Sequence, residues 1–132
     1  MARLPVIDVA GPGLVVGLLV FGVAFVIILF LLILLVETVA LQLSHWGDFR
    51  SSLKASFLMN LASTVVGLLF LWLVPALGFL SIFIAWALSV LIETLVLMRL
   101  RRGENRLNLI TALIANLASY ILLIIPSYLL SG

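Results

Sequence analysis

Four long apolar runs alternate with short polar stretches along the chain. The runs extend over about residues 14–43, 55–74, 77–98 and 107–125. A helix needs about 20 apolar residues to cross the roughly 30 Å hydrocarbon core of a bilayer. Each run is close to this length or exceeds it, and helices satisfy their own backbone hydrogen bonds in lipid. The pattern therefore predicts an all-α integral membrane protein with four transmembrane helices.

The connections between the runs are of two kinds. Residues 44–54 and 99–106 are polar, whereas runs two and three are joined by the short link Pro-Ala-Leu-Gly at residues 75–78. We expect the second run to stop at Pro75, because proline disrupts the interior of a helix. A link this short makes runs two and three antiparallel neighbours.

An internal repeat relates the two halves of the chain. The segment 36–63 aligns without a gap with the segment 92–119. The shared residues include Glu37/Glu93, Thr38/Thr94, Gly47/Gly103, Arg50/Arg106, Asn60/Asn116, Ala62/Ala118 and Ser63/Ser119. The matches at Glu, Gly, Arg and Asn, which are scarce in this chain, indicate an internal duplication. Each copy contains two helices, so both copies should have the same orientation, as in parallel repeats.

The predicted fold is thus a four-transmembrane-helix bundle built from two parallel-repeat helical hairpins. Residues 1–132 form a single membrane domain, with one repeat unit at about 14–74 and the other at about 77–130.

Basic residues predict the orientation in the membrane. Six of the seven Lys and Arg residues lie in or beside the two polar turns, namely Arg50, Lys54, Arg99, Arg101, Arg102 and Arg106. By the positive-inside rule both turns are cytoplasmic and both termini face outward. We expect these six side chains to contact lipid headgroups, with the arginines of the second turn best suited to lipid phosphates. We expect a bacterial or archaeal plasma membrane.

Polar residues within the apolar runs predict the centre of the bundle. In an antiparallel hairpin, residues equidistant from the turn lie at the same depth, which pairs Glu37 with Asn60 and Glu93 with Asn116. Ser63 and Ser119 lie one helical turn further on. The helix face that carries Asn60 continues through Thr64 to Gly67, and small residues let helix backbones approach closely. The predicted intramembrane polar core consists of six side chains: Glu37, Asn60, Ser63, Glu93, Asn116 and Ser119.

Two interpretations of the glutamates remain open. A membrane-embedded ionisable group is by default a candidate site for an ion, a proton or a ligand. Alternatively, Glu37 and Glu93 hold the bundle together, because apolar surroundings favour the neutral form of a carboxyl group, which can bond to an amide.

Composition excludes several classes of function. The chain is 66% hydrophobic and 9% charged, contains no cysteine, and has a single histidine, His45. It offers no nucleophile–base set, no glycine-rich phosphate loop and no multi-histidine metal site, so we expect no enzyme activity, no metal or other cofactor and no nucleic-acid partner. His45 and Trp46 are predicted to form an interfacial pair, and Trp72 and Tyr128 an outer aromatic belt.

Two functions fit these features best. The first is a non-catalytic accessory or scaffold subunit that packs in lipid against other membrane subunits or against a second copy of itself. The alternative is a small ion or solute transporter or channel that uses the Glu37 and Glu93 pair. A third, a lipid- or quinone-binding helper, has no specific feature in its favour.

Overall fold

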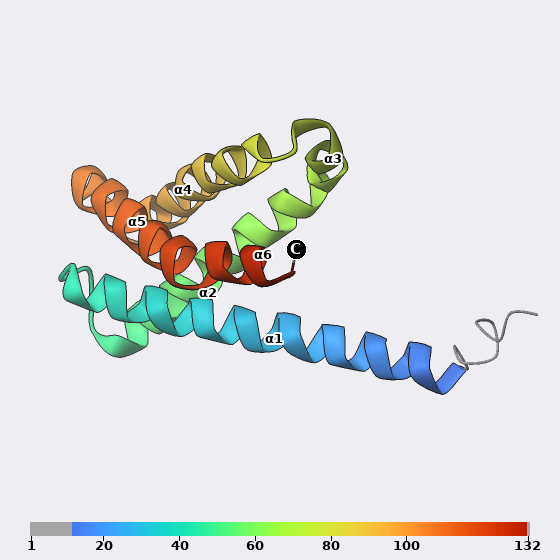
Figure 1. Ribbon diagram of the computed structural model, residues 1–132. Coiled ribbons are helices and arrows are strands. Elements are labelled where there is room, and N and C mark those ends of the chain that lie inside the picture. The colour runs from blue at the N-terminus through green and yellow to red at the C-terminus, as the bar shows by residue number, and fades with distance from the viewer. Residues whose placement is uncertain (1–11, 132) are drawn as a thin grey trace, which may run out of the picture. The chain divides into compact units, whose positions relative to one another are not determined.

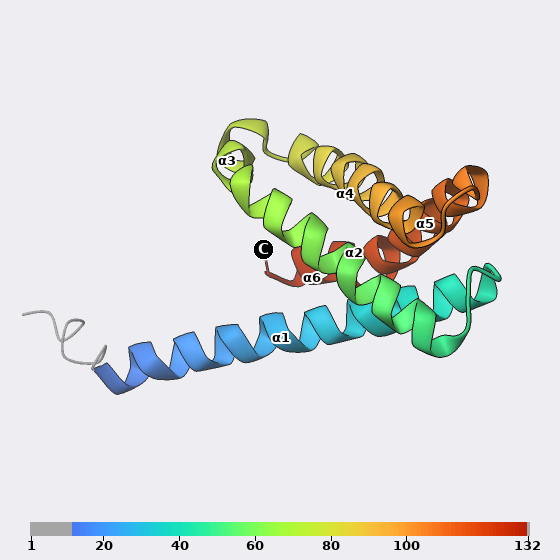
Figure 2. The same cartoon turned by 180° about the vertical axis from the view of Figure 1, so that it is seen from behind.

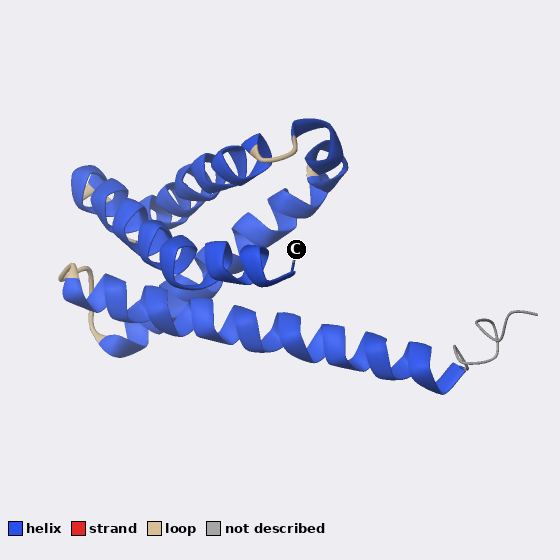
Figure 3. Ribbon diagram, viewed as in Figure 1, coloured by secondary structure: helices blue, strands red, loops and turns tan. Residues whose placement is uncertain are grey.

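The computed structural model describes residues 12–131 (Figure 1). Helices account for nearly all of this range, which contains no strand (Figure 3). Four segments are long and apolar enough to cross a membrane: Gly13–Leu43, Phe49–Leu69, Leu80–Leu100 and Asn105–Ser127. These observations confirm the all-helical class and the four candidate spans. The predicted outer position of the N-terminus and the Tyr128 side chain lie outside the described residues.

The chain divides into two compact units, with the boundary between Leu31 and Leu32. In its described part, the first unit is only the beginning of helix α1, which extends over Pro12–Leu43. The second unit holds the rest of α1 and all later helices, and everything below concerns that unit unless the first is named.

Helix α1 ends in a turn that a non-glycine residue closes. The backbone N–H of His45 donates to Gln42 O and that of Trp46 donates to Leu41 O, both at 3.0 Å. This pair of bonds is a Schellman motif, in which the residue at the His45 position is left-handed and is usually glycine. His45 has φ 57°, so a non-glycine residue takes this left-handed position.

Helix α2 (Phe49–Leu69) begins and ends earlier than predicted. Asp48 is the N-cap residue of this helix. Its backbone is extended, and its side-chain Oδ1 accepts a hydrogen bond from the backbone N–H of Ser51 at 2.8 Å. Aspartate is a favoured N-cap residue since it satisfies a donor that has no partner within the helix. Arg50 and Lys54 therefore lie on the first turns of α2 and not in a loop.

The link between α2 and the next long helix is longer than residues 75–78. After Leu69 the chain forms a 3-10 turn, η1 (Leu71–Leu73), and a short helix, α3 (Val74–Leu77), before α4 (Leu80–Leu100). The predicted stop at Pro75 is wrong: proline lies in the first turn of α3, where no intrahelical N–H is needed. Figure 2 shows α3 at the bend between α2 and α4, which pack against each other.

The last span contains a change of helix type. Helix α5 (Asn105–Ser119) continues as a π-helical turn, η2 (Tyr120–Ile124), and then as α6 (Ile125–Ser131). Pro126 has no N–H and its ring crowds the carbonyl four residues earlier, which accounts for a disturbed turn before it. The widened turn lets the span continue past the proline.

The packed core lies beside the two polar turns. Its fully buried apolar members include Leu41, Met59, Leu97 and Ala112. Fully buried polar side chains are mixed with them, among them Asn108 and Thr111. The Thr111 hydroxyl has no hydrogen-bond partner among the described residues. Towards α3 the side chains of α2 and α4 become exposed, so the core ends at the level of the glutamates.

Candidate functional site: a carboxylate–amide–hydroxyl network at the base of a cavity

Both buried glutamates accept a hydrogen bond from the asparagine of their own hairpin. Glu37 and Glu93 are each 1% exposed. Asn60 Nδ2 donates to Glu37 Oε2, and Asn116 Nδ2 donates to Glu93 Oε2. The second proton of each amide goes to its own helix, to Ser56 O at 2.9 Å and to Ala112 O at 3.0 Å. Both asparagines are therefore fixed in orientation, and each keeps one glutamate oxygen as an acceptor.

The other oxygen of each glutamate faces a serine from the opposite half of the chain. Ser119 Oγ lies 2.8 Å from Glu37 Oε1, and Ser63 Oγ lies 3.1 Å from Glu93 Oε1. The structure thus brings together all six residues of the predicted polar core. Helices α1, α2, α4 and α5 each contribute, and the asparagine and serine bonds to Glu37 recur at the matching positions around Glu93.

Each serine hydroxyl lies within hydrogen-bond distance of two acceptors but has one proton to donate. Ser63 Oγ is also 3.2 Å from Asn60 O, and Ser119 Oγ is 3.2 Å from Asn116 O. A hydroxyl has one proton and two lone pairs. If the serine donates to the glutamate, that group is a carboxylate. If it donates to the backbone carbonyl, a protonated glutamate can donate to the serine. The same heavy-atom positions therefore satisfy either protonation state.

A cavity of about 520 Å³ borders this network. Both glutamates and both asparagines line it at one end, together with Ser63 and Ser119. From there it extends towards α3, where its walls are mostly apolar; they include Phe70, Leu73, Leu77, Ile84 and Leu88. This size lies within the usual range for small-molecule sites, about 300–1,000 Å³. A largely apolar chamber with a few convergent polar groups is the usual form of such a site.

The small residues beyond Ser63 do not make the close helix contact that we predicted. Thr64 and Gly67 line the cavity instead. A Cβ atom added at Gly67 would meet no neighbouring atom within 4 Å. This face of α2 therefore contacts neighbouring helices at Ser56, Asn60 and Ser63, and further along the helix it forms a wall of the cavity.

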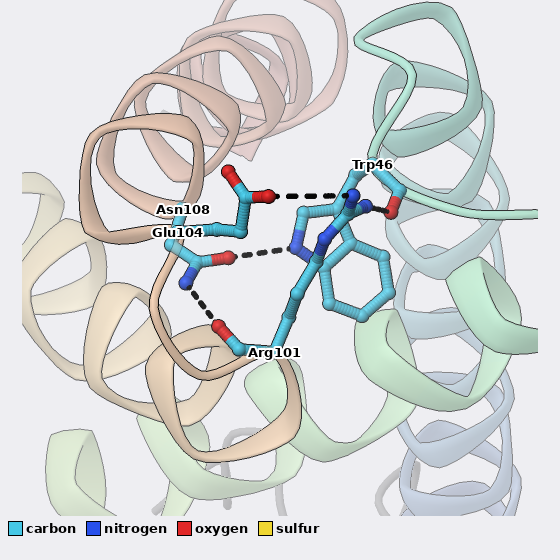
Figure 4. A network of polar contacts seen from close by, with 4 residues as sticks. All are labelled: Trp46, Arg101, Glu104 and Asn108. Carbon is cyan, nitrogen blue, oxygen red and sulfur yellow. Dashed lines mark hydrogen bonds and ion pairs between the residues drawn. The ribbon is translucent and has the colours of Figure 1, made fainter.

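A second polar cluster joins the two turns (Figure 4). Trp46 Nε1 donates to Asn108 Oδ1 at 2.8 Å, Asn108 Nδ2 donates to Arg101 O at 2.8 Å, and Arg101 donates to Trp46 O. Glu104 lies 3.9 Å from the Arg101 guanidinium. The predicted interfacial role of Trp46 is wrong, because it is 5% exposed and bonded within the core, whereas His45 beside it is exposed.

Five of the six predicted headgroup-contact residues have exposed side chains: Arg50, Lys54, Arg99, Arg102 and Arg106. Arg101 is the exception, since it is half-buried and its guanidinium is held by Trp46 O. Lys54 and Arg101 also line a smaller hollow of about 320 Å³. The structure therefore separates Arg101, which joins the turns, from the others.

Sequence patterns did not identify the cavity walls or the role of Asn108. Tyr120 and Ser89 line the cavity but lie just outside the two segments that align, 36–63 and 92–119. Asn108 is an asparagine near the start of an apolar run, a signal that could have marked it as buried and bonded. The wall leucines carried no signal, because leucine is the background of this chain.

No family model, curated protein or solved structure matches this chain.

Proposed function

We propose that this protein is an integral membrane protein that binds a small solute at the Glu37 and Glu93 pair and moves it across the bilayer. The observation that carries the proposal is the cavity of about 520 Å³ with both carboxyl groups at one end. Bundle stabilisation alone requires no space beside the glutamates, whereas a binding site does. The cavity therefore favours the transporter alternative over a purely structural role for these residues.

The proposed architecture places the four candidate spans in the bilayer as two like-oriented hairpins. The recurrence of the glutamate, asparagine and serine bonds at matching positions of the two halves supports the duplication. The clustering of basic residues at one end supports cytoplasmic turns. The two glutamates then lie about two helical turns inside the cytoplasmic boundary, where an ionisable group is costly without a function.

Flux through reconstituted vesicles tests the proposal. Proteoliposomes that contain a pH-reporting dye would be given gradients of protons, K⁺ or tetraethylammonium in turn. We expect at least one gradient to drive proton movement through the wild-type protein and not through the Glu37→Gln/Glu93→Gln variant. Glu104→Gln is the matched control, because it makes the same chemical change at an exposed residue outside the cavity. Equal proton movement in protein-containing and empty vesicles would overturn the transport role.

A second candidate is the accessory-subunit role. Its support is the apolar surface of α2, α4 and α5, most of which is exposed in the described chain. Lipid or another membrane subunit can cover such a surface. Blue-native electrophoresis after mild extraction distinguishes the two: migration as a monomer without copurified chains would contradict the subunit role.

A further inference from the structure

We propose that the occupant of the cavity is an amphipathic organic cation, with its positive group at Glu37 and Glu93 and its apolar body against the walls near α3. This inference rests on the proposed solute-binding function and names the class of solute. Three features of the site lead to it: the sign of its charge, the nature of its walls and the way its protons are held.

The charge of the site selects a cation. Glu37 and Glu93 line the cavity, and none of its lining residues is basic. Their hydrogen-bond partners are amide and hydroxyl groups, which are neutral. A buried charge is stabilised by a partner of opposite charge, and the described part of the chain places none beside these two groups. A cationic ligand supplies that partner, whereas an anion would be repelled.

The walls select an organic cation over an inorganic one. Along α2 the lining runs from Asn60 to Phe70, which is about 15 Å at the helical rise of 1.5 Å per residue. The lining around η1 and α3 is apolar and consists of Phe70, Leu73, Val74 and Leu77, so a hydrated metal ion would lose water there without gaining oxygen ligands. No group of three or more His, Cys, Asp or Glu side chains suited to a metal occurs in the described chain. An apolar body gains about 25 cal/mol for each Å² that it buries against such walls.

The aromatic residues fit the same class. Phe70 lines the cavity from the α3 end, and Tyr120 lines it from the π-helical turn beside Ser119. Aromatic rings attract organic cations through their faces as well as offering apolar surface. An organic cation would thus meet rings along the cavity and carboxylates at its end.

The serines provide an exchange of the cation for a proton. When the cation is absent, a proton on Oε1 of either glutamate can be donated to Ser119 or Ser63 without a change of heavy-atom positions. When a cation arrives, the glutamate can lose that proton to water and, as a carboxylate, accept a hydrogen bond from the serine hydroxyl instead. The cation and the proton therefore compete for the same oxygens. Cation binding should weaken as the pH falls, because protonation removes the charge that attracts the ligand.

Two tetraphenyl ions of nearly equal size and opposite charge test the charge selection. Protein in nanodiscs of zwitterionic lipid would be titrated with tetraphenylphosphonium, tetraphenylborate and neutral triphenylphosphine oxide, and empty nanodiscs would correct for partition into lipid. We expect saturable binding of tetraphenylphosphonium with a Kd about tenfold or more below those of the other two probes. Glu37→Gln/Glu93→Gln should weaken it about tenfold or more, and Glu104→Gln should not.

If the glutamate variants fail to fold, a variant that fills the cavity still tests whether the cavity binds tetraphenylphosphonium. Gly67→Leu adds a side chain to the cavity wall at a position where an added Cβ atom meets no neighbouring atom within 4 Å. It should fold and weaken tetraphenylphosphonium binding about tenfold or more. Ala87→Leu is the control, because it adds a leucine at an exposed position of α4 that does not line the cavity, and it should leave binding unchanged.

The outcomes separate the two proposals. Equal or tighter binding of the borate or the neutral probe, still blocked by Gly67→Leu, overturns the cation class but leaves a solute site in place. Binding that neither Gly67→Leu nor the glutamate variants weaken overturns the cavity as the site. Binding without flux overturns transport alone, since the flux assay of the proposed function is independent of this titration.

Discussion

At the residue scale, the two asparagines hold the site in place. Asn60 and Asn116 each use both amide protons, one on a glutamate and one on a backbone carbonyl. No other residue type of this size supplies two donors from one nitrogen and no positive charge. A carboxylate in apolar surroundings needs such donors, so the asparagines contribute to the stability of the fold as well as to the geometry of the site.

Removal of one asparagine should be costly. We expect Asn60→Leu or Asn116→Leu to lower the free energy of unfolding by about 1–3 kcal/mol, because a glutamate oxygen loses its donor while remaining buried. Asn105→Leu is the matched control, since Asn105 is exposed. Thermal unfolding of the purified protein in detergent measures the change. A loss no greater than that of the control would show that the amide bonds contribute little.

His45 is strained where glycine would not be. It has φ 57° at the end of α1 and its side chain is exposed, so little packing depends on it. A non-glycine residue in this region carries a backbone strain on the order of 1 kcal/mol or more. His45→Gly should therefore raise the stability by about 1 kcal/mol in the same assay. His45→Ala keeps the strain and should not raise it; equal gains in both variants would contradict the explanation.

At the scale of elements, the two halves differ at the start of their second helices. Asp48 caps α2, whereas Glu104 makes no capping bond to α5 and instead lies near Arg101. Glutamate is one methylene longer and is not a favoured N-cap residue. Both turns therefore carry an acidic residue, but only the side chain of Asp48 caps the helix that follows.

The Asp48 cap should give α2 a dependence on pH. The backbone N–H of Ser51, and then its hydroxyl, hold the pKa of Asp48 below its usual value by bonding to the carboxylate. A lowered folded-state pKa means that the stabilisation is present above the unfolded pKa, near pH 4, and is lost as the pH falls below it. Asp48→Asn keeps a cap that does not titrate, so its stability relative to wild type should rise as the pH falls from 6 to about 3. A constant difference would rule out the cap as the titrating group.

The 3-10 turn η1 and the π-helical turn η2 both contribute residues to the wall of the cavity. The turn η1 and helix α3 line one end, and the π-helical turn η2 brings Tyr120 and Ile124 into the lining. Regular helices that continued to the ends of both hairpins would be expected to pack along their whole length. Pro75 and Pro126 lie in or beside these irregular segments. We infer that the prolines help to keep the far half of the hairpins apart.

At the scale of the whole molecule, the proposed orientation can be tested with single cysteines because the native chain contains none. Glu104→Cys lies in the second polar turn and Ala76→Cys in α3, and both positions are exposed. A membrane-impermeant maleimide added to intact cells should label Ala76→Cys alone, whereas inverted vesicles should expose Glu104→Cys alone. Labelling of both positions from one side would contradict the four-span topology.

The sequence alone determined the helical class, the four candidate spans and the pairing of each glutamate with an asparagine. These follow from apolar run lengths and from equal spacing about a turn, which are local properties of the chain. Helix ends were less predictable, because an N-cap at Asp48 and a left-handed His45 override the simple change from polar to apolar residues.

Only the tertiary structure decided which serine meets which glutamate, that Trp46 is buried against Asn108, and that Gly67 faces a cavity. Each of these depends on how far neighbouring helices stay packed before they separate. In a chain made mostly of leucine, isoleucine and valine, a wall of a cavity and a closed helix contact have the same composition. The separation of the helices, and with it the space for a ligand, is therefore a property of the packed fold that no local pattern records.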